Sequence, residues 1–195
     1  MMQGAAAAKR LVNNYLAYDL PERLLTYRNH WHLDEDSLPD PLLYLTYEPV
    51  ALDTWPTIIT VAISTPQMSR VDYDASLNPE YQVRYTMRTY VWVRADGSEY
   101  CTEIRDNLTT VLRSALLDHA SLKTADHNDC GVRVEEGNLR EEFSDLTLIK
   151  GDRVMAGAYI GYDLTLTEHI TRRNIAELES IEIESEVLEE PLSWQ

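Results

Sequence analysis

The chain has 195 residues, 44% of them hydrophobic, which fits one globular domain with an extended terminus. Its formal net charge of −16 argues against binding nucleic acid through the phosphate backbone and against docking on an anionic membrane, because both need a surface rich in cations. Two cysteines are too few for a disulfide framework, and neither a signal-peptide pattern nor an apolar run of membrane-spanning length is present. We therefore expect a soluble protein made in a reducing cytoplasm.

The first part of the chain predicts helices followed by an irregular segment. Apolar residues recur at helical spacing between Ala8 and Leu16. A second, short helix is predicted to begin at Asp19, with Pro21 tolerated in its first turn. Residues 30–47 are rich in Asp and Pro and predict an irregular segment, in which residues 42–47 form a short edge strand.

Two strands are predicted next. Thr57–Thr65 is dense in β-branched residues and predicts a buried strand, and residues 72–79 predict a loop. Tyr81–Arg94 alternates with a period of two, so that one face is apolar and the other amphipathic. The amphipathic face carries basic and aromatic side chains: Arg84, Arg88, Tyr90, Trp92 and Arg94.

A long helix and two or three further strands complete the pattern. The helix is predicted from an N-cap at Ser98 to about His119, with an apolar stripe that begins at Ile104. Arg105 is expected on its solvent side. The strands are predicted at Val132–Glu135, Asp145–Ile149 and Ala156–His169.

This order of elements predicts an α+β fold, in which a mostly antiparallel sheet of about four strands has helices packed on one face. We expect a single domain over residues 1–172 and an acidic C-terminal extension over residues 173–195. From Asn174 onward the chain has seven Glu and no Lys or Arg, which is typical of a segment that orders only on contact with a partner. Glu177, Glu184 and Glu190 are its candidate contact residues.

Two clusters contain residue types that occur in chemical sites. His30-Trp31-His32, followed by Asp34, Glu35 and Asp36, resembles a metal site, but no matching Cys or His pair occurs elsewhere, and a solvated acidic loop explains the cluster better. His127 and Cys130 are neighbours in sequence, which rarely gives the convergent geometry of a nucleophile and its base.

Patterns for a nucleophile elbow, a phosphate-binding loop or a dinucleotide fold are missing from the sequence. We therefore predict no catalytic residue, no metal site and no cofactor.

The amphipathic strand face offers two interpretations. Arg84, Arg88, Tyr90 and Trp92 combine cations with aromatic rings, which suits base stacking on single-stranded nucleic acid. The same residue types are enriched where proteins contact one another. Because the chain is strongly acidic, a protein interface is the favoured interpretation.

Four segments, taken in order after the N-terminal helix, carry a resemblance to a known family. They are Trp55-Pro56-Thr57-Ile58-Ile59, the strand Arg84–Arg94 (RYTMRTYVWVR), the helix from Arg105-Asp106-Asn107-Leu108 to Leu116-Leu117, and the strand Tyr159–Leu166 (YIGYDLTL). The chain resembles the tail terminator, or tail completion, proteins of long-tailed bacteriophages, particularly phages that infect actinobacteria. The resemblance covers about residues 5–170 and rests on element order and on an RY-x-x-R-x-Y-V-W-V-R pattern, without a catalytic signature.

The resemblance implies a structural virion protein rather than an enzyme. Such proteins assemble into a ring, usually of six subunits, that caps the tail tube, ends its polymerisation and joins the tail to the head connector. The implied partners are further copies of the chain, the tail-tube protein and the head–tail connector or stopper protein, in the tail or neck of the virion. Direct contact with nucleic acid or membrane is not expected.

Three features depart from the family pattern: a longer chain, the acidic extension, and a loop rich in Pro and Asp at residues 33–41. Another neck component, an adaptor or a stopper, therefore stays open as an alternative, because neck proteins share similar folds. The predicted helix at 98–119 favours a terminator over the small barrel expected of a stopper. A small metal-binding protein or enzyme is the alternative of a different class, and predicts metal uptake that is lost in a His30→Ala, His32→Ala variant.

Overall fold

The computed structural model describes residues 4–73, 78–118, 121–125, 128–144, 148–150 and 153–169. Within these ranges the chain forms two helices and six strands. In chain order they are α1 (Ala5–Trp31), β1 (Leu43–Leu45), β2 (Thr57–Tyr73), β3 (Pro79–Ala95), α2 (Ser98–Leu117), β4 (Val132–Phe143), β5 (Leu148–Lys150) and β6 (Arg153–His169).

The described strands form one sheet in the order β1-β2-β3-β6-β4, and β5 also pairs with β6. Only the β1–β2 pair is parallel, while every other pair is antiparallel. The predicted α+β class and mostly antiparallel sheet are confirmed, with six described strands where about four were expected. The extension at residues 173–195 lies outside the described residues, as does its boundary with the domain.

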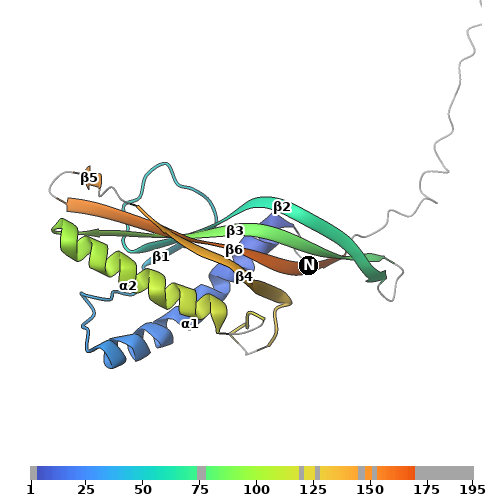
Figure 1. Cartoon of the computed structure of the whole chain (residues 1–195), viewed down its shortest axis with the longest axis horizontal. Helices are drawn as coiled ribbons and strands as arrows, with labels where there is room; N and C mark the ends of the chain where they lie inside the picture. The colour runs from blue at the N-terminus through green and yellow to red at the C-terminus, as the bar shows by residue number, and fades with distance from the viewer. Residues whose placement is uncertain are drawn as a thin grey trace, which may run out of the picture.

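The alternation along β3 separates the two faces of the sheet. Odd-numbered side chains from Val83 to Val93 are buried, whereas even-numbered side chains from Arg84 to Arg94 lie on the opposite face and are half-buried. β6 pairs residue for residue with β3, so its even-numbered side chains from Ala156 to Leu166 join the same core. Both helices lie on this buried side of the sheet (Figure 1).

The N-terminal helical region is one helix, not two. α1 continues through Asp19 and past Pro21 to Trp31, which also shortens the predicted irregular segment. A proline inside a helix removes the hydrogen bond to the carbonyl four residues earlier, here that of Ala17. Ala17 and Pro21 are both exposed, so water can satisfy this carbonyl and the helix continues.

Buried polar contacts fix α1 against the rest of the domain. The Tyr15 hydroxyl donates a hydrogen bond of 2.7 Å to the carbonyl of Ala115. This carbonyl lies in the last turn of α2, where helix carbonyls lack intrahelical donors. Near the other end of α1, buried Arg28 donates from Nε to the carbonyl of Leu38 at 2.7 Å and pairs with Asp40 at 2.9 Å. These bonds fix the loop after α1 as well as the helix.

β2 and β3 extend beyond the helix-covered part as a projecting hairpin (Figure 1). β2 is buried from Thr57 to Thr60, but all its residues from Ile63 to Tyr73 are exposed. The prediction of a buried strand over Thr57–Thr65 is therefore wrong for its last three residues, because no described helix covers the sheet there. We call residues 63–73 the β2 arm.

Two local predictions around α2 are also wrong. The N-cap is Gly97, with φ 89°, a left-handed backbone that favours glycine, and Ser98 is the first helical residue. Arg105 is buried rather than solvated: its Nη1 donates to the carbonyl of Ser144 at 2.9 Å and its guanidinium lies 5.2 Å from the Phe143 ring centroid. Arg105 thus ties α2 to the end of β4.

β4 is much longer than the predicted Val132–Glu135. It continues to Phe143 after a register irregularity between Glu135 and Arg140, and it covers the edge of β6. The predicted strand at Asp145–Ile149 is seen in part as β5, since residues 145–147 lie outside the described residues. Neither described helix is long and apolar enough to cross a membrane.

Candidate interaction surface

The sheet face opposite the helices carries most of the side chains singled out from the sequence. We call this the open face; it is made of even-numbered β3 residues, odd-numbered β6 residues and the β4 residues paired with them. Arg84, Arg88, Tyr90 and Trp92 all lie on it, as the alternation predicted. The loop 46–56 folds over part of this face, beside Ile59, Tyr90 and Trp92 (Figure 1).

A polar network occupies the middle of the open face. The Arg84 guanidinium donates to Asp163 from Nε at 3.2 Å and from Nη2 at 2.8 Å, and Nη2 also lies 2.7 Å from a Glu135 oxygen. The Asp163 carboxylate also accepts from the Thr86 hydroxyl at 2.7 Å and from Asn138 at 3.1 Å. Its side chain is only 16% exposed. Arg84 is therefore neutralised by two carboxylates and joins three strands, so it positions the face.

An aromatic cluster lies next to this network. The Tyr90 and Tyr159 rings have centroids 5.3 Å apart, and the Arg88 guanidinium lies 4.7 Å from the Tyr159 centroid. A hydrogen bond to the Glu142 carboxylate raises the pKa of Tyr159 above its ordinary value, because the carboxylate accepts from the protonated hydroxyl. Trp92 lies across Gly157 on the adjacent strand. The cluster is thus amphipathic, held in place by packing, and half-exposed.

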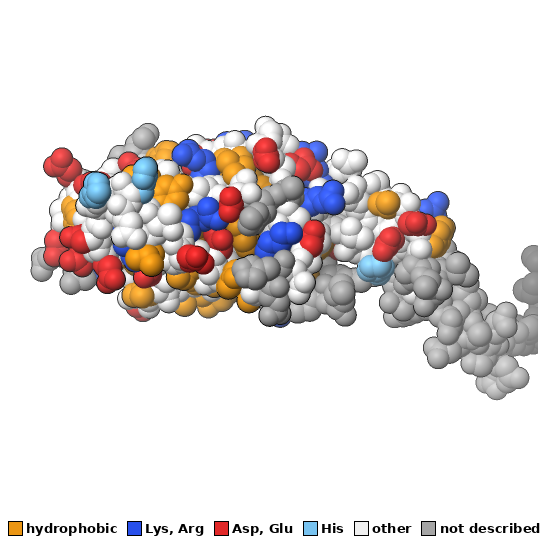
Figure 2. Space-filling model, turned by 90° about the horizontal axis from the view of Figure 1, so that it is seen from below, with side chains coloured by type: hydrophobic (Ala, Val, Ile, Leu, Met, Phe, Trp, Pro, Cys, Tyr) orange, Lys and Arg blue, Asp and Glu red, His pale blue; other side chains and the backbone are white. Residues whose placement is uncertain are grey.

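The open face differs in charge from the chain as a whole. Among the side chains that the structure describes, it carries five arginines against four acids, although the chain has almost twice as many acidic as basic residues. The arginines are Arg84, Arg88, Arg94, Arg133 and Arg140, and the acids are Glu80, Glu135, Glu142 and Asp163. On the helix side, acidic side chains gather at the end of the molecule opposite the arm (Figure 2). The open face is therefore a locally basic surface on an acidic protein.

The β2 arm adds an exposed apolar surface. Ile63, Met68, Val71 and Tyr73 are between 41% and 62% exposed. In the described part of the chain β1 covers the outer edge of β2 only at residues 57–59, so the edge of the arm is unpaired there. A long exposed strand edge is a template for pairing with another chain.

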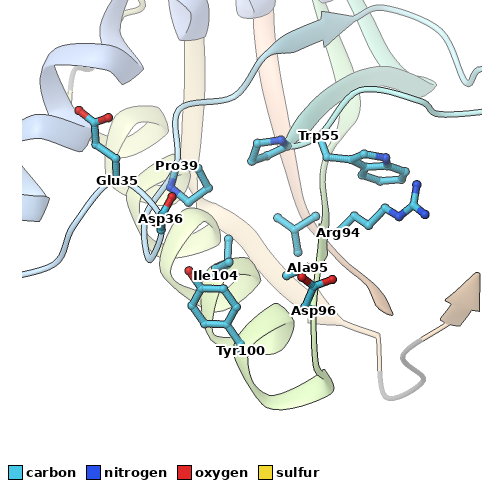
Figure 3. A pocket seen from close by; sticks show the side chains of 11 residues that line it. Glu35, Asp36, Pro39, Trp55, Arg94, Ala95, Asp96, Tyr100 and Ile104 are labelled. Carbon is cyan, nitrogen blue, oxygen red and sulfur yellow. The ribbon is translucent and has the colours of Figure 1, made fainter. Parts of the chain in front are cut away.

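A cavity of about 400 Å³ lies at the end of the sheet away from the arm (Figure 3). Trp55 and Arg94 lie side by side on one wall, Tyr100 and Ile104 come from α2, and Glu35 and Asp36 come from the loop after α1. Its lining has carboxylates, an arginine and aromatic rings, but none of its lining residues is Ser, Thr, Cys, His or Lys. The arrangement of charged and aromatic side chains can contact a polar partner.

The remaining candidate residues do not come together. His30 is exposed in the last turn of α1, and His32 is its left-handed C-cap, with φ 58°. Among the residues that the structure describes, no three His, Cys, Asp or Glu side chains are grouped to hold a metal ion. Burial raises the pKa of both thiols, Cys101 and Cys130, which disfavours the reactive thiolate. Glu177, Glu184 and Glu190 lie outside the described residues.

Sequence reasoning missed the residues that β6 and β4 contribute. The alternation of 156–169 already placed Tyr159 and Asp163 on one side of a strand, which was a usable signal. Their pairing with Arg88 and Arg84 depends on strand order and register, which the sequence pattern does not provide. Neither a protein-family model nor a curated protein matches the chain. The open face is therefore interpreted from its own residues.

Proposed function

We propose that this chain is a structural assembly protein, a tail terminator that closes into a ring on the end of a phage tail tube, ends tube polymerisation and joins the tail to the head connector. The observation that carries the proposal is one-sided coverage of the sheet. Two helices bury one face, while the other presents Arg88, Tyr90, Trp92 and Tyr159 without a described helix over it. Aromatic and arginine side chains on an accessible surface favour contact with another protein.

The two borders of the sheet support a ring rather than a two-fold pair. β2 and β4 form opposite borders of the sheet, and along most of their length neither outer edge is paired within the described residues. Contact between unlike borders of successive copies is heterologous, and such contacts close into a ring when the rotation between copies allows it. The β2 arm, with its exposed apolar side chains, supplies a projecting element for such a contact.

Capping follows from the same asymmetry. A subunit that matches the tube end on one side and offers a different surface on the other adds once and leaves no site for the next tube ring. The second surface is then available to the connector. This function requires a matching surface on each side of the subunit and no chemical step.

Another neck component, an adaptor or a stopper, is the second candidate. The same open face and arm suit any protein that joins two rings, because fold alone does not separate these roles. Binding to the end of the tail tube separates them, because the terminator proposal requires this contact. A metal-binding protein or small enzyme is the third candidate, and loss of metal uptake on His30→Ala, His32→Ala substitution would favour it.

The test is the mass of the purified protein by light scattering over a range of concentrations, with negative-stain images of the same fraction. A mass that is a multiple of 22.4 kDa together with closed rings supports the assembly function. A single-copy mass at every concentration, with no rings when tail-tube protein is added, rejects it.

A further inference from the structure

The open face and the C-terminal segment have opposite charges. Residues 174–195 contain seven Glu and no Lys or Arg, whereas the described side chains of the open face include five Arg against four acids. Exposed like charges repel, so a strongly acidic surface is a poor one for such a segment. The open face lacks the acidic excess of the chain as a whole.

Within the open face, Arg88 and Arg140 face each other across β6 and are the two cations that the proposal concerns. Arg84 is already neutralised by Asp163 and Glu135. Arg88 instead lies over the Tyr159 ring, and Arg140 is 61% exposed, with its Nε 4.0 Å from a Glu142 oxygen. Arg140 also lies above Gly161, directly across β6 from Arg88. These two arginines and the Tyr159 ring form one basic, partly apolar patch.

The direction of β6 points the C-terminal segment away from the patch of its own subunit. β6 passes through Tyr159 and Gly161 and ends at His169, which pairs with Glu80 near the arm. The chain therefore leaves its own patch behind and heads toward the arm. The 26 residues from Ile170 to Gln195 reach about 85 Å when extended, at roughly 3.3 Å per residue, which is long enough to reach an adjacent subunit.

We propose that residues 174–195 of one copy bind the open face of the neighbouring copy, with their glutamates beside Arg88 and Arg140. The proposal rests on the proposed function, because it needs a neighbour in an assembly. The contact links adjacent subunits through charge, independently of how their sheets meet, and leaves the β2 arm for a different contact. Because the patch is half-exposed, the contact is sensitive to ionic strength.

Binding can be measured without a ring. The host is the full chain with the seven glutamates of residues 174–195 changed to Gln, so that its own segment does not compete. The probe is a fluorescein-labelled synthetic peptide of residues 174–195, and its anisotropy reports binding. We expect saturable binding that weakens about tenfold or more when Arg88→Glu and Arg140→Glu are added to the host. Raising the salt from 50 to 500 mM is expected to weaken it as well.

Arg10 is an exposed residue of α1, on the other side of the sheet, and Arg10→Glu is the matched control. This change is expected to alter the affinity of the host for the peptide less than twofold. A second host carries the milder changes Arg88→Gln and Arg140→Gln, which remove the charges without reversing them. Circular dichroism checks that both double variants are folded. No binding to the host, or equal binding with and without the Arg88 and Arg140 changes, overturns the proposal. Rings without peptide binding reject this contact alone. Peptide binding without any ring rejects the proposed function and, with it, a neighbouring copy as the source of the segment.

Discussion

The indole of Trp92 occupies the space that a side chain at Gly157 would need. A Cβ built on Gly157 would lie 2.8 Å from Cζ3 of Trp92, closer than real Cβ contacts come. The two residues face each other on adjacent antiparallel strands, β3 and β6. The missing side chain at Gly157 therefore fixes how Trp92 lies on the open face.

Gly157→Ala is expected to displace the Trp92 ring and to weaken assembly, while reducing the free energy of unfolding by only about 1–3 kcal/mol. Near-ultraviolet circular dichroism reports the ring, and light scattering reports assembly. Gly161→Ala is the control, because there the added Cβ meets the flexible Arg140 side chain at 3.1 Å. A larger effect of Gly161→Ala than of Gly157→Ala on the near-ultraviolet signal would contradict this packing.

Trp92→Ala separates an interface residue from a core residue. Because Trp92 is half-buried, its removal is expected to lower the free energy of unfolding by only about 1–2 kcal/mol. Association is expected to weaken by about 2 kcal/mol or more, as at an interface hot spot. Met87, fully buried on the opposite face of the same strand, is the control, and Met87→Ala is expected to cost about 2–5 kcal/mol of stability. Equal destabilisation of both variants in urea would assign Trp92 to the core.

The β2 arm is expected to serve contact rather than stability. Changing Met68 and Val71 together to Lys should leave the free energy of unfolding within about 0.5 kcal/mol, since both side chains are at least half exposed. The same change is expected to reduce ring formation, measured by light scattering and negative stain. Ile58→Lys, in the buried part of the same strand, is the control that should unfold the protein. Full ring formation by the Met68, Val71 variant would exclude the arm from the interface.

Tyr15 gives a prediction on alkaline stability. Burial raises the pKa of Tyr15 from 10.0 to about 12, so the unfolded chain loses this proton at lower pH than the folded chain. The stabilisation of the folded state by the protonated Tyr15 hydroxyl is therefore fully present below pH 10 and is lost as the pH rises from 10 to 12. Tyr15→Phe is expected to cost about 1–2 kcal/mol at pH 7, because the Ala115 carbonyl loses its donor, and to reduce the loss of stability above pH 10. Urea unfolding between pH 8 and 11.5 measures both effects, and an unchanged alkaline slope would contradict the assignment.

The sequence was sufficient where one strand or helix determines its own pattern. The strict alternation of Tyr81–Arg94 separated the faces of β3, and so placed Arg88, Tyr90 and Trp92 together correctly. The apolar stripe from Ile104 likewise predicted α2. In both cases the pattern matches the period of the element and needs no knowledge of its neighbours.

The sequence was insufficient where a neighbour decides the structure. The second half of β4 (GNLREEF) has no strand-like alternation, and it is extended because it pairs with the edge of β6. The burial of Arg105 depends on Phe143 and the Ser144 carbonyl, far away in the chain. The hydrogen bond from Arg84 to Asp163 likewise depends on the register between β3 and β6, which brings the two side chains together.

The most direct test of the central claim is tube growth. Under the proposed function the partner is a phage tail-tube protein. That protein is polymerised alone and with this protein, and tube lengths are measured by negative stain. We expect shorter tubes whose ends carry a ring of the added protein, and we expect Trp92→Ala to restore their length. Tubes of unchanged length, with no added protein at their ends, would contradict the account.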